Sequence, residues 1–370
     1  LGNVATGFGG AVQVGLGANP GSATLAGTTS VTASGGFATF ATLRLNRTGS
    51  GYTLTASATS VTGVTSAAFD IAAGAAGSLV MVQQPSAAAT NGAVLAVQPI
   101  VQLQDANGNA VARAGVTVTA SVNGTPAGVA LAGASATTDA TGKASFSGLT
   151  ISGPVGSYLL NFSAAGLSGA SSSAVALAAG PAARLQILTQ PSSTATTAVA
   201  FPQQPTVQVQ DAAGNAVAQA GVVITAAIAT GGGTLGGTTT ATSNASGLAA
   251  FTNLSISGAA GARTLRFTAT GLTADSSSVT LGAGAATQVS LQAGNGQTAV
   301  TGSAVLTPPA VLVRDASGNP VAGVAVTFAV TGGLGTVVPT TAVTTGGNGI
   351  AAATSWTLGT GAGANALQAS

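Results

Sequence analysis

The sequence predicts an all-β protein built from β-sandwich domains in tandem. Three observations lead to this prediction. A short motif recurs about every 105 residues, apolar and polar residues alternate in short segments, and glycine, at 55 of 370 residues, is frequent between those segments.

The recurring motif is Asp105-Ala-Asn-Gly-Asn109, which returns as Asp211-Ala-Ala-Gly-Asn215 and Asp315-Ala-Ser-Gly-Asn319. The copies are 106 and 104 residues apart. This period is too long for a solenoid unit and suits one self-contained sandwich. The chain is therefore a tandem array of similar domains.

A second marker defines the edges of the repeats. The junctions read Gly74-Ala-Ala, Gly180-Pro-Ala-Ala and Gly284-Ala-Ala, which divides the chain into residues 1–74, 75–180, 181–284 and 285–370. We expect the first repeat to be incomplete at its N-terminal side and to lack opening strands. We expect the last to be incomplete at its C-terminal side and to lack its closing strand. The chain begins at Leu1 without an initiator methionine or signal peptide, so we expect it to be part of a longer polypeptide.

Alternation of side chains identifies individual strands. In Pro99–Gln104, Val101 and Leu103 alternate with Gln102 and Gln104, which predicts one buried face and one face in water. The segment 205–210 repeats this pattern. Further predicted core positions are Val116, Val118, Val222, Ile224, Val324, Val326, Phe40, Leu43, Leu45, Phe146, Leu149, Ile151, Phe251, Leu254 and Ile256.

Seven or more short strands in about 105 residues, separated by turn residues, predict an immunoglobulin-like sandwich. No segment shows the 3.6-residue apolar period of a helix. The junctions are short, because the strand expected at Phe69–Ala73 is followed almost at once by the strand expected at Ser78–Val82. Short connections restrict the angles between domains, so the sequence predicts an extended rod.

The composition argues against an enzyme. The chain has 8 basic and 6 acidic residues in 370, no histidine and no cysteine, and all of its acids are aspartates. General acid–base catalysis needs neighbouring titratable groups, and nucleophilic triads need a base. Zinc and copper sites need histidine or cysteine. We therefore predict no catalytic residue, no cofactor and no disulfide.

Two kinds of partner are also disfavoured. The basic residues form only small pairs, Arg44 with Arg47 and Arg263 with Arg266, whereas nucleic-acid binding needs a cluster of positive charge. No apolar run reaches about 18 residues, so no transmembrane segment is predicted.

The recurring turn allows two interpretations. Its aspartate can accept backbone N–H bonds and its glycine can adopt a left-handed conformation, which indicates a structural turn. The residues of this turn are Asp105, Gly108, Asn109, Asp211, Gly214, Asn215, Asp315, Gly318 and Asn319. Alternatively, Asp105, Asp211 and Asp315 are weak calcium candidates, although calcium takes six to eight oxygens and usually several carboxylates.

The outward-facing residues are mostly Gln, Thr, Ser, Asn and Ala. So few charges permit close lateral contact between chains, because little charge would need to be desolvated. Glycosylation is possible at the Asn-x-Ser/Thr sequences that begin at Asn46, Asn123, Asn161, Asn244 and Asn253. Trp356 aligns with Leu149 and Leu254, which favours a core position over a ligand platform.

The residues carry a family resemblance. Val313–Phe328, with Ser355–Gly359 and Gly363–Leu367, resembles the bacterial immunoglobulin-like domains of the invasin/intimin group. Asn19–Thr29, with Gly51–Ser57, is similar to repeats of very large bacterial surface proteins. The resemblance implies domains that form stalks, hold an adhesive tip away from the cell, and sometimes bind directly.

Three functions remain open on the sequence. The first is a non-enzymatic extracellular rod at the bacterial cell surface, acting as an adhesin stalk or fibre. The second is a self-assembling filament or sheath subunit that packs through uncharged β faces. The third is a glycan-binding accessory module of an enzyme or phage tail. The expected partner is a second copy of the chain or a host or surface receptor.

Overall fold

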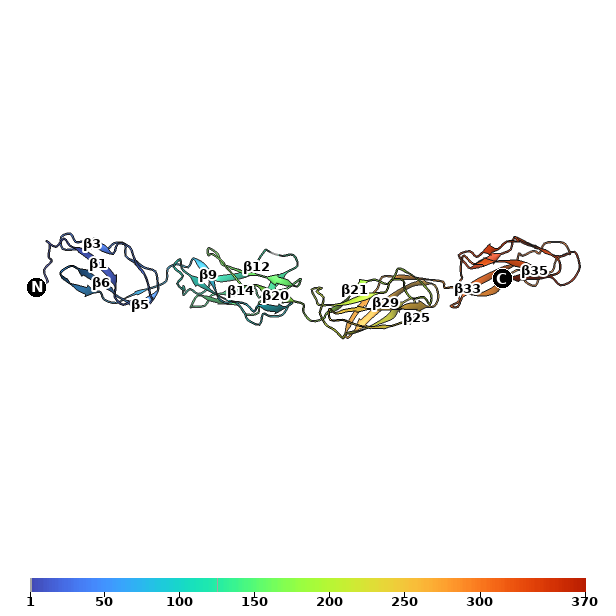
Figure 1. Ribbon diagram of the computed structural model, residues 1–370, viewed down its shortest axis with the longest axis horizontal. Helices are drawn as coiled ribbons and strands as arrows, with labels where there is room; N and C mark the ends of the chain where they lie inside the picture. The colour runs from blue at the N-terminus through green and yellow to red at the C-terminus, as the bar shows by residue number, and fades with distance from the viewer. Residues whose placement is uncertain (1, 125) are drawn as a thin grey trace. The chain divides into compact units, whose positions relative to one another are not determined.

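The computed structural model describes residues 2–124 and 126–370, and these residues form β-strands and turns with no helix. The chain divides into two compact units, Leu1–Gly180 and Pro181–Ser370. Each unit contains two of the sequence repeats, and each sheet takes its described strands from a single repeat (Figure 1). The all-β prediction is confirmed.

Residues 75–180 form a β-sandwich. Its strands are β9 (Ser78–Gln83), β10 (Ala88–Thr90), β11 (Ile100–Gln104), β12 (Thr117–Val122), β13 (Ala130–Ala132), β14 (Ser135–Thr137), β15 (Lys143–Ser145), β16 (Thr150–Ser152), β17 (Gly156–Tyr158), β18 (Leu160–Ser163), β19 (Ala170–Ser171) and β20 (Val175–Ala178). The two main sheets have the orders β15-β11-β9 and β14-β12-β18-β19, and β10-β20-β17 and β13-β16 are smaller sheets. The core draws on both main sheets through the fully buried Leu103, Val118 and Leu160. Burial of each such side chain contributes about 1.5–3 kcal/mol.

Residues 181–284 repeat this arrangement. The strands are β21 (Arg184–Thr189), β22 (Thr194–Thr196), β23 (Thr206–Gln210), β24 (Val223–Thr230), β25 (Thr234–Gly236), β26 (Thr240–Thr242), β27 (Leu248–Ala250), β28 (Ser255–Ser257), β29 (Gly261–Ala269), β30 (Leu272–Asp275) and β31 (Val279–Gly282). One sheet has the order β21-β23-β27, and a larger one has the order β22-β31-β29-β24-β26 with β30 on β29. Val209, Ile224 and Leu265 occupy the core positions of Leu103, Val118 and Leu160 and are equally buried.

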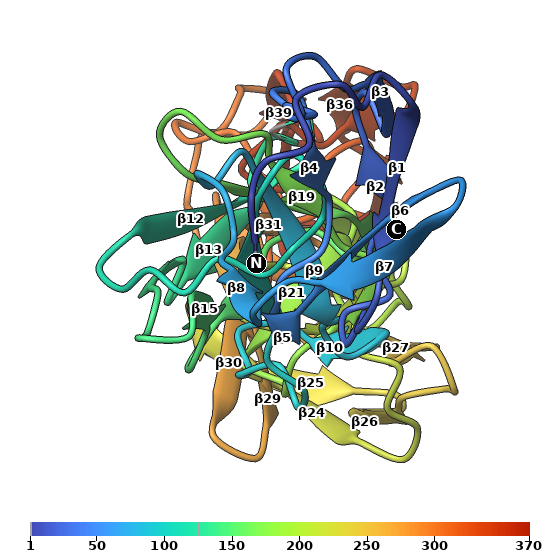
Figure 2. The ribbon, with the colours of Figure 1, turned by 90° about the vertical axis from the view of Figure 1, so that its left-hand side faces the viewer.

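Residues 2–74 contain the counterpart of one main sheet. The strands are β1 (Ala11–Leu16), β2 (Leu25–Ala26), β3 (Ser30–Thr32), β4 (Arg44–Leu45), β5 (Gly49–Tyr52), β6 (Leu54–Ala58), β7 (Val61–Thr65) and β8 (Phe69–Ile71). The sheet β3-β1-β6-β7 corresponds to β14-β12-β18-β19. The β6–β7 hairpin extends away from the rest of this repeat in Figure 2, and Val61 and Val64 on it are exposed. Accordingly, the predicted core residues Phe40, Leu43 and Leu45 are only half-buried.

Residues 285–370 contain counterparts of both main sheets, one of them divided into two-stranded sheets. The strands are β32 (Ala286–Ala293), β33 (Ala310–Asp315), β34 (Ala325–Val326), β35 (Phe328–Gly332), β36 (Thr336–Val338), β37 (Val343–Thr344), β38 (Ile350–Ala352), β39 (Ser355–Thr357) and β40 (Ala366–Ala369). The sheet β32-β33-β38 corresponds to β9-β11-β15. On β32, Val289 is 54% and Leu291 69% exposed, whereas Leu79 and Leu185, which have the register of Val289, are buried.

One part of the strand prediction is wrong. Gln102 and Gln208, expected on the wet face of their strands, are buried, with Gln102 only 4% exposed. The reason is that a neighbouring turn folds over this face and takes a hydrogen bond from each amide. Gln102 Nε2 donates to Thr141 O at 3.0 Å, and Gln208 Nε2 donates to Ser246 O at 2.8 Å. Burial of each side-chain amide is tolerated because its N–H group is hydrogen-bonded.

Candidate functional site

The recurring turn is organised around its aspartate. Asp105 Oδ1 accepts hydrogen bonds from the backbone N–H groups of Asn107 and Asn109, both at 2.9 Å. Asp105 Oδ2 accepts from Asn109 Nδ2 and from the backbone N–H of Gly74, a junction residue, again at 2.9 Å each. Gly108 has φ of +79°, a left-handed conformation that glycine adopts without strain. Four N–H donors therefore converge on one carboxylate.

These donors stabilise the charged form of the aspartate. The side-chain bond from Asn109, followed by the backbone bonds from Gly74 and Asn109, lowers the pKa of Asp105 from 3.8 to about 2. The turn therefore carries a full negative charge at neutral pH and keeps it well into the acid range.

The turn of the last repeat has the same geometry. Asp315 Oδ1 accepts from the backbone of Ser317 and Asn319 at 2.8 Å, and Oδ2 accepts from Asn319 Nδ2 at 2.9 Å and Gly284 N at 2.8 Å. Burial by itself raises the pKa of Asp315, but the bonds from Asn319 and Gly284 outweigh it and hold this pKa below its ordinary value. In the third repeat, Asn215 likewise donates through its backbone and side chain to Asp211, at 2.8 and 2.9 Å.

The asparagine that ends the turn also contacts the preceding repeat. Asn109 Nδ2 donates its second hydrogen to Asn46 O at 3.1 Å, and Asn109 Oδ1 accepts from Thr48 N at 3.2 Å. Asn46 and Thr48 belong to the loop between β4 and β5. Asn109 itself is buried, at 8% exposed, and both bonds are partly buried. We call this two-sided contact the asparagine clasp.

The second unit contains the same clasp. Asn319 Nδ2 donates to Gly258 O at 3.0 Å, and Asn319 Oδ1 accepts from Ala260 N at 2.7 Å. Gly258 and Ala260 lie in the loop between β28 and β29. A contact between Thr197 Oγ1 and Ser317 Oγ at 3.4 Å lies beside it. Asn319 is 5% exposed, and its amide has a partner for each of its two hydrogens and for its oxygen.

The calcium candidates do not come together. Asp105, Asp211 and Asp315 lie in different repeats, and within residues 2–124 and 126–370 no three residues of His, Cys, Asp or Glu are grouped as a metal site. Each carboxylate is engaged by the asparagine of its own turn instead.

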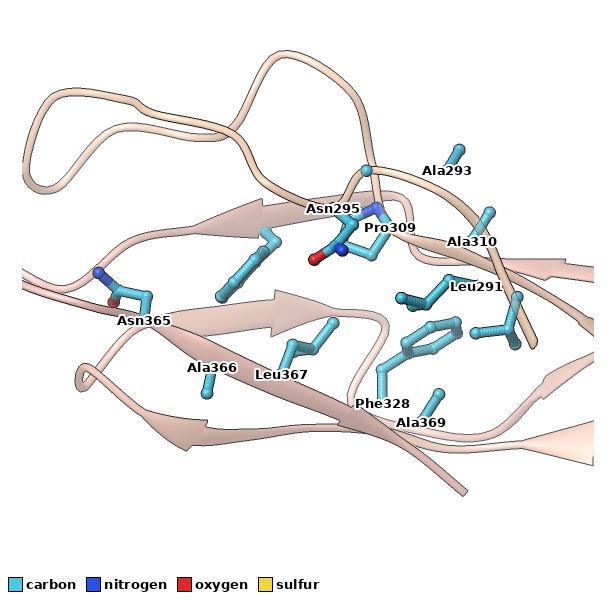
Figure 3. A pocket seen from close by; sticks show the side chains of 13 residues that line it. Leu291, Ala293, Asn295, Pro309, Ala310, Phe328, Asn365, Ala366, Leu367 and Ala369 are labelled. Carbon is cyan, nitrogen blue, oxygen red and sulfur yellow. The ribbon is translucent and has the colours of Figure 1, made fainter. Parts of the chain in front are cut away.

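A cavity of about 260 Å³ lies in the last repeat. Figure 3 shows Leu291, Phe328 and Leu367 directed into it, with Asn295 and Asn365 at its border. Trp356 also lines it and packs on the core, as the alignment with Leu149 and Leu254 predicts. Val305 N–H donates to Trp356 O in the same way that Leu95 N–H donates to Leu149 O. The lining contains no titratable side chain, so it offers no group for proton transfer.

The two arginines of the basic pair in the second unit, Arg263 and Arg266, have different surroundings. Arg266 forms a salt bridge of 2.7 Å with Asp275, while Arg263 is buried. Among the possible glycosylation sequences, Asn46 lies at a clasp, and the sequence at Asn123 includes Thr125, which lies outside the described residues. The side-chain oxygen of Asn244 accepts bonds from Ser246 and Leu248.

The sequence did not reveal the residues that bind the clasp asparagines. Asn46, Thr48, Gly258 and Ala260 contribute backbone atoms, and backbone atoms leave no constraint on side-chain type. One signal was available: Gly-Asn keeps its phase in every repeat, at Asn3, Asn109, Asn215 and Asn319. A structural turn alone needs the glycine more than it needs this asparagine.

No helix in the described part of the chain has the length and apolarity to cross a membrane. Residues 75–177 match the family model described as the Ig-like domain 6 of SMCHD1. No curated protein matches the sequence.

Several solved structures are similar to the chain. FdeC, an adhesin of Escherichia coli, is 21% identical over 79% of this chain and 92% of its own, with a TM-score of 0.37. Invasin, a bacterial integrin-binding protein, is 16% identical over 79% of this chain and 56% of its own, with a TM-score of 0.34. The S-layer protein SbsC is 13% identical over 100% of this chain and 49% of its own, with a TM-score of 0.28. The chain is an all-β protein of tandem immunoglobulin-like domains, and its structural neighbours include bacterial immunoglobulin-like adhesins and an S-layer protein.

Proposed function

We propose that this chain is a non-enzymatic structural protein of the bacterial cell surface, a stalk or fibre whose immunoglobulin-like repeats are locked in sequence by asparagine clasps. The observation that carries the proposal is the recurrence of one contact at two joints. Asn109 and Asn319 each bind a carbonyl and an N–H two residues apart in the loop of the preceding repeat.

A clasp of this kind limits bending between neighbouring repeats. One planar amide bonded on both sides fixes direction as well as distance, and its burial reduces the competition from water. The aspartate orients the amide by holding its other hydrogen, and it also holds the junction glycine, Gly74 or Gly284. Turn, linker and preceding loop thus act as one joint.

The recurring turn is, on this proposal, structural rather than an ion site. The two oxygens of Asp105 receive four N–H donors, as do those of Asp315, which leaves little lone-pair capacity for a cation. The absence of histidine, cysteine and glutamate from the sequence supports a non-enzymatic role. The resemblance of Val313–Phe328 to invasin-type domains supports a place at the bacterial cell surface.

Single-molecule force spectroscopy of the full chain tests the stalk. Residues 75–180 and 181–284 should unfold in separate events, each releasing about 350 Å of contour length at the 3.3–3.6 Å per residue of an extended chain. A single cooperative rupture of the whole chain would refute the proposal.

A second candidate function is lateral self-assembly into a filament or sheath. It is favoured by the outer face of the sheet β14-β12-β18-β19, on which the outward residues of β12, β14 and β18 are uncharged: Thr117, Thr119, Ser121, Ser135, Thr137, Asn161 and Ser163. In the third repeat, Arg266 and Asp275 on the corresponding sheet neutralise each other. Electron microscopy distinguishes the two functions, since polymers of regular repeat favour assembly and dispersed single chains favour the stalk.

A further inference from the structure

We infer that Tyr52 and Arg263 are positioning residues of the joints. Each fixes the loop of the preceding repeat to which the clasp asparagine binds. This inference rests on the proposed function of the clasp. The relevant observation is that one strand position sends its side chain back to that loop with the same spacing in both units, although the residue types differ.

The position is defined by strand pairing. Tyr52 pairs with Phe69, Tyr158 with Val175 and Arg263 with Val279. Each side chain bonds a backbone carbonyl four residues earlier: Tyr52 Oη to Thr48 O at 3.4 Å, Tyr158 Oη to Pro154 O at 2.8 Å, and Arg263 Nη2 to Ala259 O at 2.5 Å. An arginine thus makes the contact that a tyrosine makes elsewhere.

The loop that Tyr52 or Arg263 binds is the same loop that the clasp asparagine binds. Tyr52 also donates to Arg47 O at 3.0 Å, between Asn46 and Thr48, which both bind Asn109. Ala259, held by Arg263, lies between Gly258 and Ala260, which both bind Asn319. In each joint the carbonyl of the central residue of a three-residue segment is bound from its own domain, while its two neighbours bind the clasp asparagine of the next domain. In the first joint Tyr52 also contacts the carbonyl of Thr48, at the longer distance of 3.4 Å.

The surroundings of Arg263 show that this contact has a cost. Arg263 is 5% exposed, its Nε has no hydrogen-bond partner, and its Nη1 donates to the carbonyl of Ala262. Gly231, with φ of +90°, leaves the room it needs, because a Cβ there would lie 2.6 Å from Arg263 Cδ. A buried cation bonded to carbonyls is expensive to keep, so its retention at the joint needs a compensating role.

In immunoglobulin folds, a tyrosine bonded to an upstream carbonyl stabilises its own domain. That simpler role predicts effects on the stability of one repeat only. A positioning role predicts, in addition, a change in the angle between two repeats. Distance distributions between repeats separate the two, and the chain has no native cysteine to interfere with spin labelling.

The test uses the full chain with spin labels attached at the exposed positions Thr242→Cys and Thr344→Cys. Pulsed electron paramagnetic resonance then measures the distribution of distances between the two labels. We expect Arg263→Ala to broaden the distance distribution as far as Asn319→Ala does. Arg263→Tyr should restore the narrow distribution, because tyrosine serves this position in the second repeat. Amide exchange at Ala260 should accelerate roughly tenfold in Arg263→Ala, the scale of one lost hydrogen bond.

A gentler variant covers the case in which Arg263→Ala does not fold. Tyr52→Phe removes one oxygen atom, and labels at Ser30→Cys and Thr137→Cys report on the first joint. A narrow distribution in Tyr52→Phe or Arg263→Ala, beside a broad one in Asn319→Ala, would overturn the positioning role and leave the clasp intact. Failure of Arg263→Tyr to restore the narrow distribution would also overturn it. A narrow distribution in Asn319→Ala would instead overturn the proposed function.

Discussion

Asn319 Nδ2 donates a 3.0 Å hydrogen bond to the carbonyl of Gly258, a residue of the preceding repeat 61 positions earlier. Asn109 makes the equivalent bond to Asn46 at 3.1 Å, 63 positions earlier. Both asparagines end a turn whose aspartate binds their other hydrogen. The same asparagine side chain therefore belongs to the local turn and to the long-range joint. A substitution that disrupts one of them should also destabilise the other.

Asn109→Ala should weaken the first joint. The substitution leaves Asn46 O and Thr48 N without their partner and removes one donor from Asp105, which should cost about 1–3 kcal/mol. The matched control is Asn107→Ala on the same turn, because Asn107 is exposed and the third repeat carries Ala213 there. Denaturant unfolding of the full chain should show a loss for Asn109→Ala and a change within about 0.5 kcal/mol for the control. Equal losses would argue against the clasp.

The joints should weaken in acid. The pKa of Asp105 is about 2 in the folded chain and 3.8 ordinarily, so the unfolded chain takes up a proton first as pH falls. The stabilisation is therefore complete above about pH 4 and is lost between about pH 4 and pH 2. Melting temperatures measured by circular dichroism across this range should be flat above pH 4 and fall below it. Asp105→Asn should melt lower at pH 7 and depend less on acid.

Asp139→Asn should be tolerated where Asp105→Asn is not. Asp139 Oδ1 accepts from Thr141 N, Thr141 Oγ1 and Lys143 N, and in the third repeat Asn244 Oδ1 accepts from Ser246 N, Ser246 Oγ and Leu248 N. One carbonyl-like oxygen is enough for this turn. Asp105 accepts N–H bonds on both of its oxygens. In Asp105→Asn the side-chain NH₂ group would replace one of these oxygens and face an N–H donor that it cannot bind. Melting temperatures at pH 7 compare the two variants directly, and a larger loss for Asp139→Asn would contradict this reasoning.

Calcium should leave the chain unchanged. Because the carboxylates of Asp105 and Asp315 already receive four N–H bonds each, millimolar calcium or a chelator should not shift the melting temperature. Calorimetry with and without calcium measures this, and a rise in melting temperature that Asp315→Ala abolishes would establish an ion site.

Gly318→Ala should destabilise the recurring turn of the last repeat. Gly318 has φ of +83°, where an L-residue is strained by roughly 1–2 kcal/mol. Gly347→Ala is the control, since Gly347 is exposed, has no strained φ, and a methyl group added there would meet no other atom within 4 Å. Thermal unfolding of the two variants should differ in favour of Gly347→Ala.

Periodicity predicted the core well. Val118, Ile224 and Val326 alternate with polar neighbours in the sequence, and all three are buried. The same rule failed at Gln102, because alternation assigns a face to each residue but cannot show that a turn from elsewhere covers that face. Prediction from pattern was thus correct for these three apolar side chains. It was only partly right for Phe40, Leu43 and Leu45, which are half-buried, and it was wrong for Gln102, whose hydrogen-bond partner is distant in the sequence.

The joint lay beyond sequence reasoning for a physical reason. The phase of the Asp-x-x-Gly-Asn turn is evident in the sequence, and its glycine and aspartate explain the local bend. The partners of Asn109 and Asn319 are backbone atoms some 60 residues away, in loops whose side chains vary. The common position of Tyr52 and Arg263 was hidden as well, because two unlike residues bind the carbonyl of the central residue of the clasped segment, Arg47 or Ala259.

Amide hydrogen exchange at Thr48 and Ala260 in the full chain tests the central claim most directly. Both N–H groups donate to a clasp asparagine, at 3.2 and 2.7 Å, and neither bond exists unless consecutive repeats are in contact. We predict that both amides are protected, that Asn109→Ala exposes Thr48 and Asn319→Ala exposes Ala260, and that the strand amide of Leu265 stays protected throughout. Exchange of Thr48 and Ala260 in the unmodified chain at the rate of an unstructured peptide would contradict the account.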